Sequence, residues 1–257
     1  MAFTIAISNE KGGVAKTTTT LSLGAALVEL GQKVLLIDLD PQANLTLALG
    51  FDPSTIEQVV GNSLLENEPI ENAIHKTDID NLYLIPTNHH LEEAEQLLPA
   101  MIGYVTRLQT AITNSSFKEY NVIIIDCPPS LGAITVNALT AAQLLIIPTQ
   151  AEYLSAYALR DMMTLIRKIR SDSNSSLAYL VLITMFDRRN RTHRNIQEQL
   201  ENTFGKGLLK TVIEVDTKLR ESPILGVPIT QYKPSSRGAL QYRQLAEELL
   251  EYVQKTD

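Results

Sequence analysis

The chain has 257 residues, 44% of them apolar, with one cysteine and a formal net charge of −7. This composition allows one sizeable core, which predicts a single domain over residues 1–257, and it excludes an internal disulfide framework, as expected for a cytoplasmic protein. No apolar run approaches the ~20 residues that cross a bilayer, and the acidic balance excludes indiscriminate attraction to nucleic acid, so DNA binding would need a local basic cluster.

Short apolar runs without polar alternation recur along the chain. They are Ile5–Ile7, Val34–Ile37, Leu82–Ile85, Val122–Ile125, Leu144–Ile147, Leu180–Ile183 and a weaker run at Val212–Val215. Strands that are buried on both faces have this pattern, because helices cover each side of a parallel sheet. Helical patterns lie between the runs, at 17–30, 92–113, 133–142, 156–170, 195–204 and 238–253. Residues 51–80 are expected to form short helices and loops over one sheet edge. We therefore predict an α/β doubly wound, mostly parallel sheet of about seven strands flanked by helices.

A phosphate-binding loop is predicted directly after the first run, at Lys11-Gly12-Gly13-Val14-Ala15-Lys16-Thr17-Thr18. Glycines let successive N–H groups point into one concavity, and the helix that follows adds the positive end of its dipole. The usual motif G-x-x-x-x-G-K-[ST] places its lysine on the phosphates and its hydroxyl on Mg²⁺, but here Ala15 replaces the glycine before Lys16. A methyl group at Ala15 is expected to fit if φ stays negative. The alternative is a plain glycine-containing turn between strand and helix.

Carboxylates follow two of the buried runs, at the strand ends where ligands gather in such sheets. Asp38 and Asp40 end the second run, and two like charges there would be costly without a cation or a lysine between them. Asp126 ends the fourth run before two prolines, at the position of an acid that orients Mg²⁺, usually through water. An ordinary acidic strand end is the alternative. Cys127 is interpreted as a small filler of the strand end rather than a reactive thiol, because no base is paired with it.

These motifs resemble those of the ParA and MinD ATPases, whose deviant Walker A box reads K-G-G-x-x-K-[ST]. The resemblance covers nearly the whole chain, including the turn at Thr184–Asp187 and the helix around Tyr242–Glu248, and it is closest to the short chromosomal ParA proteins also called Soj. It implies a deviant Walker P-loop fold, ATP and Mg²⁺ as ligands and a homodimer that forms with ATP. It also implies slow hydrolysis that a ParB-like or other adaptor protein accelerates.

The resemblance assigns roles to individual residues. Lys11 matches the signature lysine that reaches across the dimer interface to the partner's phosphates, and Lys16 matches the lysine of its own loop. Asp40 matches the aspartate that positions or activates the attacking water. Mg²⁺ is expected at Thr17, Asp38 and Asp126, with the aspartates acting through water. Nucleotide contacts are expected from Lys11, Gly12, Gly13, Val14, Ala15, Lys16, Thr17, Thr18 and Met185.

A basic cluster follows the sixth run, where ParA relatives carry DNA-contacting arginines. It consists of Arg188, Arg189, Arg191 and Arg194. The family also offers basic residues at the positions of Lys218 and Arg220, and further on at those of Lys233 and Arg237. Phosphate contacts need charge and reach rather than base-edge geometry, so binding to double-stranded DNA would be independent of sequence and sensitive to salt. The alternative is an arginine-rich loop that is merely solvated.

The last helix separates the resemblance to ParA from that to MinD, whose relatives end in a basic amphipathic membrane helix. Here glutamates oppose the apolar face, which disfavours anionic lipid and favours packing on the sheet. We therefore predict a nucleoid-associated positioning ATPase that acts on a chromosome, a plasmid or a protein organelle such as a carboxysome. The rival is an ATPase switch that does not act on DNA, as in MinD or the metal-chaperone relatives. A metal cluster held by cysteine pairs is excluded because Cys127 is alone.

Overall fold

The computed structural model describes residues 2–114, 117–153 and 155–256. At its centre lies one eight-stranded sheet in the order β3-β4-β2-β5-β1-β6-β7-β8. The strands are β1 (Phe3–Ile7), β2 (Val34–Asp38), β3 (His75–Lys76), β4 (Leu82–Ile85), β5 (Val122–Asp126), β6 (Leu144–Gln150), β7 (Ala178–Phe186) and β8 (Leu208–Glu214). Neighbouring strands are parallel except for β3 and β4.

The predicted doubly wound, mostly parallel sheet is confirmed. The strand beyond the expected seven is the two-residue β3, within the segment predicted to hold only short helices and loops.

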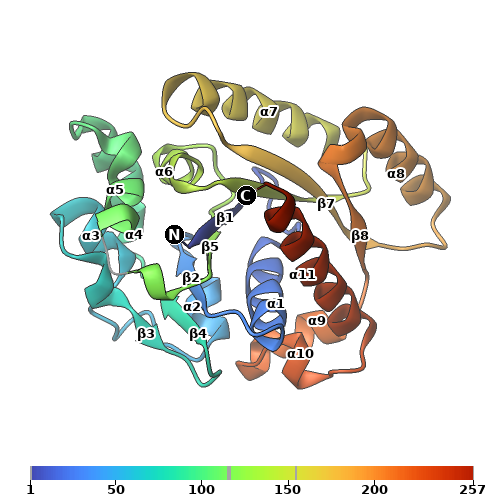
Figure 1. Cartoon of the computed structure of the whole chain (residues 1–257), viewed down its shortest axis with the longest axis horizontal. Helices are drawn as coiled ribbons and strands as arrows, with labels where there is room; N and C mark the ends of the chain where they lie inside the picture. The colour runs from blue at the N-terminus through green and yellow to red at the C-terminus, as the bar shows by residue number, and fades with distance from the viewer. Residues whose placement is uncertain (1, 115–116, 154, 257) are drawn as a thin grey trace.

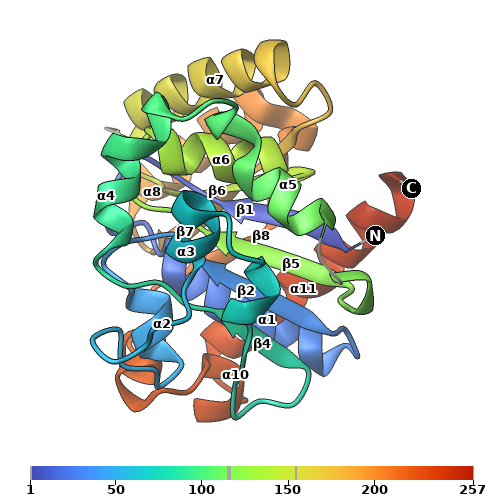
Figure 2. The same ribbon diagram turned by 90° about the vertical axis from the view of Figure 1, so that its left-hand side faces the viewer.

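Helices cover both faces of the sheet (Figures 1 and 2). One face carries α1 (Lys16–Glu29), α2 (Asn44–Ala48), α9 (Lys218–Glu221), α10 (Ile229–Tyr232) and α11 (Arg237–Thr256). The other carries α3 (Val60–Glu66), α4 (Leu91–Leu97), α5 (Arg107–Asn114), α6 (Ala133–Ala141), α7 (Ser155–Asp172) and α8 (Arg191–Phe204). Successive strand residues enter opposite cores: Ile124 packs on the α1 side, and Ile123 and Ile125 pack on the α6 side. This arrangement explains the apolar runs without polar alternation.

The last helix, α11, packs its apolar side against the rest of the molecule. Tyr242, Leu245 and Leu249 are buried, and the Tyr242 hydroxyl shares a 3.1 Å hydrogen bond with the hydroxyl of Thr19 on α1. The predicted packing of this helix on the body of the protein is confirmed. Among the described residues, no helix has both the length and the apolar character needed to span a membrane.

Two helices differ from those predicted. The expected helix over 92–113 is divided into α4, two 3-10 turns (Leu98–Ala100 and Tyr104–Thr106) and α5. Pro99 lacks the N–H that an α-helix needs, and Gly103 adopts φ +68°. α8 begins at Arg191 rather than at 195, because the Asn190 side chain accepts a hydrogen bond from the Thr192 N–H and caps the helix. Two of the four clustered arginines, Arg191 and Arg194, therefore lie on a helix.

Candidate functional site

The predicted phosphate loop joins β1 to α1 at the carboxyl edge of the sheet. Gly13 has φ +73° and Ala15 has φ +68°, so the backbone passes twice through the left-handed region before α1 begins. The Thr184 hydroxyl donates to the Val14 carbonyl at 3.0 Å, which ties the loop to β7. A Cβ built at Gly12 or Gly13 would meet no atom within 4 Å apart from its chain neighbours. The loop therefore faces open space that an anion can enter.

The conformation of Ala15 differs from the expectation. The sequence predicts that a methyl group fits here if φ stays negative, whereas the observed φ is +68°. A side chain in this region crowds the following carbonyl, at a cost of about 1–2 kcal/mol. The surrounding contacts impose the turn: Val14 is tied to β7, and the Ala15 carbonyl accepts the Thr19 N–H at 2.9 Å as the first bond of α1.

Lys16 lies buried at the centre of the loop, with 7% of its surface exposed. Its ammonium group donates to the carbonyl oxygens of Asn9 and Lys11 at 3.1 and 3.2 Å. Burial lowers the pKa of Lys16, although the carboxylates of Asp126 and Asp40 oppose this effect. The ammonium charge is therefore incompletely compensated, and an anion bound to the loop would compensate it.

The predicted acids meet at the ends of β2 and β5, beside the loop. Asp38 and Asp126 are register partners on adjacent strands, and both are fully buried. Burial raises the pKa of Asp38 to about 7 and also raises the pKa of Asp126, to which repulsion from Asp38 contributes. Burial likewise raises the pKa of Asp40, which is 7% exposed and follows the end of β2. A bound cation would relieve the repulsion among these carboxylates.

The two strand-end acids differ in how well their oxygens are satisfied. Asp38 accepts the N–H and hydroxyl of Thr46 at 2.9 and 2.8 Å and the N–H of Asp40 at 3.1 Å. One oxygen of Asp126 accepts the Thr20 hydroxyl at 3.2 Å, and the nearby Thr17 side chain lowers the pKa of this carboxylate against the larger effect of burial. The other oxygen, Asp126 Oδ2, is buried and has no hydrogen-bond partner among the described residues.

The residues around Asp126 fit a magnesium ion that is held largely through water. A metal-bound water would satisfy the orphaned Asp126 Oδ2, and Thr17 places its hydroxyl beside the same carboxylate. The described residues contain no group of three or more His, Cys, Asp or Glu side chains that could hold a metal by itself. Mg²⁺ usually takes its other ligands from water and substrate phosphates. A magnesium nucleotide would thus bring a cation to the acids and an anion to Lys16.

Lys11 points away from the cradle of its own loop. Its ammonium group donates to Gln150 Oε1 at 2.8 Å and to Glu152 Oε2 at 2.6 Å, at the end of β6. This ion pair with Glu152 holds Lys11 at the end of β6. Gln150 Nε2 also donates to the Gly13 carbonyl at 3.2 Å and to the Met185 sulfur at 2.9 Å. Gln150 therefore brings Lys11 and Met185 together beside the loop.

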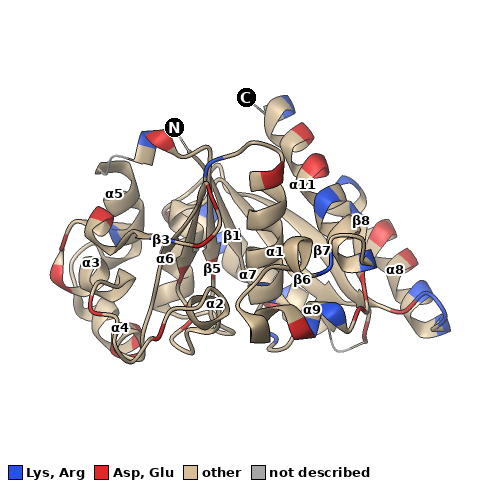
Figure 3. Ribbon diagram, turned by 90° about the horizontal axis from the view of Figure 1, so that it is seen from below, with Lys and Arg blue, Asp and Glu red and all other residues tan. Residues whose placement is uncertain are grey.

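A basic surface lies where β7 and β8 end, and Figure 3 shows Lys and Arg segments over α8, β8, α9 and the start of α11. Arg189 is 91% exposed and pairs with Asp187 at 3.1 Å. Arg188 pairs with Glu214 at 2.7 Å, and Arg194 donates to the carbonyl of Arg188. The predicted cluster is thus brought together on one surface.

The two later basic residues differ in how available their charges are. Lys218 donates to the Glu221 carboxylate at 2.7 and 3.0 Å within α9, and this hydrogen bond raises the pKa of Lys218. The Glu221 carboxylate therefore largely neutralises the charge of Lys218. Arg220, on the same short helix, is exposed. Arg220 is therefore the more accessible of the two to a nucleic-acid phosphate.

Comparison with known proteins adds independent information. A family profile described as an AAA domain matches residues 2–179. The chromosome-partitioning ATPase Soj of Thermus thermophilus is 38% identical over 252 residues, covering 98% of this chain and 96% of that protein. The chain belongs to the ParA/Soj family of partition ATPases.

Two further comparisons extend this assignment. The sporulation initiation inhibitor protein Soj of Bacillus subtilis is 41% identical over 246 residues, covering 95% of this chain and 97% of that protein. A Mycobacterium smegmatis crystal structure described as cobyrinic acid a,c-diamide synthase, with bound ATP analogue and magnesium, superposes with a TM-score of 0.85 at 34% identity. It covers 100% of this chain and 98% of the other. The fold shared with this structure thus extends over the full length of the chain.

Sequence reasoning missed several residues of this ParA/Soj site. Thr46 and Thr20 bind the acids, and Thr184 binds the loop. Gln150 and Glu152 hold Lys11. The signal available for Gln150 and Glu152 was their position within a few residues of the end of a buried run, where the rule that identified Asp38 and Asp126 also applies. Thr184 directly follows the buried run Leu180–Ile183 and carries the same signal. Thr20 and Thr46 carry no such signal, because their roles depend on contacts between distant elements.

Proposed function

We propose that this ParA/Soj-family chain is a DNA-associated positioning ATPase that uses ATP and Mg²⁺ as its ligands. ATP would bring two chains together as a sandwich dimer that binds double-stranded DNA without sequence preference on the nucleoid. A ParB-like or other adaptor protein would reset the dimer by stimulating slow hydrolysis. The cargo would be a chromosome, a plasmid or a protein organelle such as a carboxysome.

One observation carries this proposal: β7 joins the nucleotide loop to the basic surface. Thr184 donates to the loop at Val14, Met185 contacts Gln150, and the arginine cluster follows directly after Asp187. Met185 adopts φ +52° within β7, where the pairing of β7 with β8 is irregular between Ile183 and Phe186. A change at the loop would be transmitted to the arginines through only a few residues. This short connection supports coupling between nucleotide state and DNA binding.

The hydrolysis chemistry needs few residues, because phosphoryl transfer depends on positioning and charge neutralisation. Bound Mg²⁺–ATP would supply the transferable phosphoryl group and a divalent cation. Lys16 would bind phosphate from the centre of its loop, and Thr17 would hold the cation with Asp38 and Asp126 acting through water. The Asp40 carboxylate accepts the Gln42 N–H at 3.0 Å, which steadies it to orient the attacking water.

Replacing Lys11 by alanine tests the dimer part of the proposal. Because the ammonium group of Lys11 lies on Gln150 and Glu152 rather than on its own loop, Lys11→Ala should leave nucleotide affinity within about threefold. Dimerisation with ATP should be lost, since the lysine would no longer reach the partner's phosphates. Light scattering with ATP, beside titration of a fluorescent ATP analogue, measures both effects.

The matched control for Lys11→Ala is Lys76→Ala, which removes an exposed lysine from β3 at the edge of the sheet. The control should dimerise with ATP like the unchanged protein. A Lys11→Ala protein that also dimerises normally would contradict the cross-interface role.

An enzyme that forms covalent intermediates through a thiolate is a weaker alternative. Cys127 is fully buried, and burial raises the pKa of its thiol, so the thiolate needed for nucleophilic attack is disfavoured. This burial supports the interpretation of Cys127 as a filler of the strand end. An ATPase switch that does not act on DNA remains the alternative that the DNA experiments below address.

A further inference from the structure

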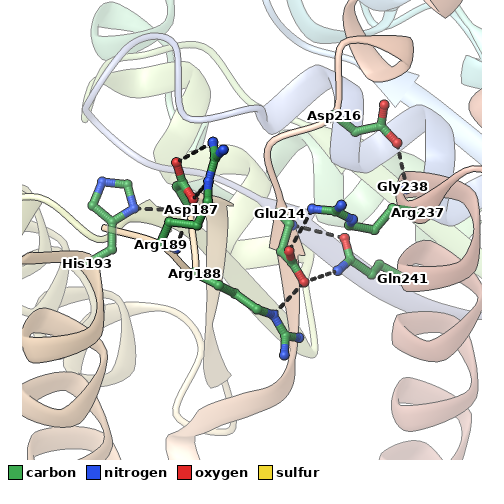
Figure 4. Close-up of polar contacts among 9 residues, drawn as sticks. All are labelled: Asp187, Arg188, Arg189, His193, Glu214, Asp216, Arg237, Gly238 and Gln241. Carbon is green, nitrogen blue, oxygen red and sulfur yellow. Dashed lines mark hydrogen bonds and ion pairs between the residues drawn. The ribbon is translucent and has the colours of Figure 1, made fainter. Parts of the chain in front are cut away.

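A buried carboxylate lies within the basic surface. Glu214, the last residue of β8, has 8% of its side chain exposed, whereas the side chains of Arg188 and Arg237 are 73% and 60% exposed. Arg188 Nε donates to Glu214 Oε1 at 2.7 Å, and Arg237 Nη1 donates to Oε2 at 2.8 Å. Figure 4 shows the carboxylate between the two guanidinium groups, which come from the segment after β7 and from the start of α11.

The Glu214 carboxylate is itself fixed in place. Gln241 on α11 donates to Glu214 Oε1 at 3.0 Å and accepts the Glu214 N–H at 2.9 Å, and Gln241 is buried. The Gly238 N–H donates to Asp216 at 2.9 Å, which attaches the start of α11 to the segment after β8. Two arginines that are distant in the sequence are therefore held relative to each other by one rigid carboxylate.

These arginines border two open hollows. One has a volume of about 650 Å³ and is lined by Phe186, Asp187, Arg188, Arg189, Glu214, Val215 and Arg237. The other has a volume of about 460 Å³, and Arg188, Arg194 and Lys210 line it together with Gln197, Gln241 and Gln244. The described lining of this second hollow includes no acidic side chain. Arg188 belongs to both hollows and would face an anion in either one.

The two ion pairs of Glu214 with Arg188 and Arg237 are not explained by a contribution to the stability of the fold. Exposed ion pairs stabilise a fold little, because holding two long side chains in one geometry costs conformational entropy. Arg188 binds Glu214 through Nε and Arg237 binds it through Nη1, so other N–H groups of both guanidinium groups stay available to a ligand. Planar guanidinium groups match the oxygens of phosphate, and ordering them beforehand reduces the entropy cost of binding.

We propose that Glu214 is a positioning residue that holds Arg188 and Arg237 as a pair for a backbone phosphate of duplex DNA. This inference rests on the proposed function and gives Arg237, a basic residue that the resemblance already indicated, a defined partner within the DNA-binding surface. The ion pair between Asp187 and Arg189 has no such positioning role. The two residues lie within one turn of the chain, so their pair connects no distant elements. Glu214, by contrast, connects an arginine on the β7 side of the surface to an arginine on α11.

Charge and positioning predict opposite effects for Glu214→Gln. The substitution makes the surface more positive, which by itself would strengthen DNA binding. If Glu214 positions the arginines, affinity should fall, because an amide offers one oxygen acceptor and turns its NH₂ donors towards the other guanidinium group. We expect binding about tenfold weaker at moderate salt, because two side chains would have to be ordered during binding. The logarithmic salt slope should fall by about 0.9 for each phosphate that the variant no longer neutralises.

The test measures the affinity of the whole chain with ATP for unrelated duplexes at two salt concentrations. Glu214→Gln and Arg237→Gln should both weaken binding and reduce the salt slope. Glu247→Gln is the control, because it removes the same charge from an exposed position on α11. Unchanged or tighter binding by Glu214→Gln would overturn the inference but not the proposed function. Failure of the unchanged protein to bind DNA in any nucleotide state would overturn both.

Thermal melting shows whether Glu214→Gln folds. If it does not, the exposed Arg188→Gln and Arg237→Gln variants decide the question through a double-mutant cycle. A paired phosphate site predicts that each single change weakens binding almost as much as both together. Additive effects, or unchanged binding by Arg237→Gln, would overturn the inference.

Discussion

Replacing Lys16 by alanine is expected to abolish ATP binding, with a loss of at least about a hundredfold, or about 2.7 kcal/mol. Lys16 is the buried cation at the centre of the loop, and burial lowers its pKa although the carboxylates of Asp126 and Asp40 oppose this effect. The polyphosphate of ATP would be the principal counter-charge of Lys16. Removal of the ammonium group should therefore lower the affinity for ATP more than the stability of the fold. Titration with a fluorescent ATP analogue, beside a thermal melt to verify folding, measures the effect.

Asp40→Ala provides the contrasting variant. Asp40 lies beyond the end of β2 and outside the phosphate loop, so its proposed role is on the attacking water rather than on phosphate in the ground state. Its removal should leave ATP binding intact and trap the ATP-bound dimer without hydrolysis. If Asp40→Ala failed to bind ATP, or hydrolysed it at the normal rate, the assigned role would be wrong. If Lys16→Ala bound ATP normally, the assignment of the loop would be wrong.

Reversing two arginine charges, Arg189→Glu together with Arg191→Glu, is expected to abolish DNA binding without altering dimerisation. Both side chains are exposed, and Arg189 pairs with Asp187 only two residues away, so the change should leave the fold intact. In a dimer the double change would remove phosphate-binding charges from both patches. With a slope of about 0.9 per phosphate, affinity should fall by orders of magnitude at moderate salt. A shift assay on unrelated duplexes with ATP measures this effect.

The control for this experiment is Arg167→Glu together with Lys168→Glu on α7, which changes the net charge equally. Both residues are exposed and lie outside the basic surface. This control should retain most DNA binding. Equal weakening in the two double variants would mean that net charge, rather than the arginine cluster, governs binding. If the Arg189→Glu with Arg191→Glu variant bound DNA fully, the arginine cluster would be a solvated surface without a role in DNA binding.

Much of the fold and part of the site could be predicted from local sequence signals. Buried parallel strands leave continuous apolar runs, and the rule that ligands gather at strand ends identified Asp38 and Asp126. The start of α8 also has a local signal, because Asn190 precedes Thr192 at the spacing of an N-cap, whereas the helical pattern by itself indicates a helix only from 195 onward.

Other features could not be predicted because they depend on contacts between distant segments. The positive φ of Ala15 results from a loop tied at Val14 to β7, 170 positions along the chain. The partner of Lys11 lies 141 positions away at Glu152. Glu214 appears in the sequence as an ordinary acidic residue, and only the packing of α11 beside β8 shows that it joins two arginines. A sequence pattern records periodicity but not such pairings.

DNA binding by the unchanged protein with ATP, with ADP and without nucleotide tests the central claim most directly. A chain of net charge −7 carries a small basic surface, and a dimer would place two such surfaces on one face, so each further neutralised phosphate steepens the logarithmic salt dependence by about 0.9. In a shift assay on unrelated duplexes at two salt concentrations, we predict binding with ATP only and a steep decline at higher salt. Equal binding in all three nucleotide states would contradict the coupling of DNA binding to the ATP-bound dimer.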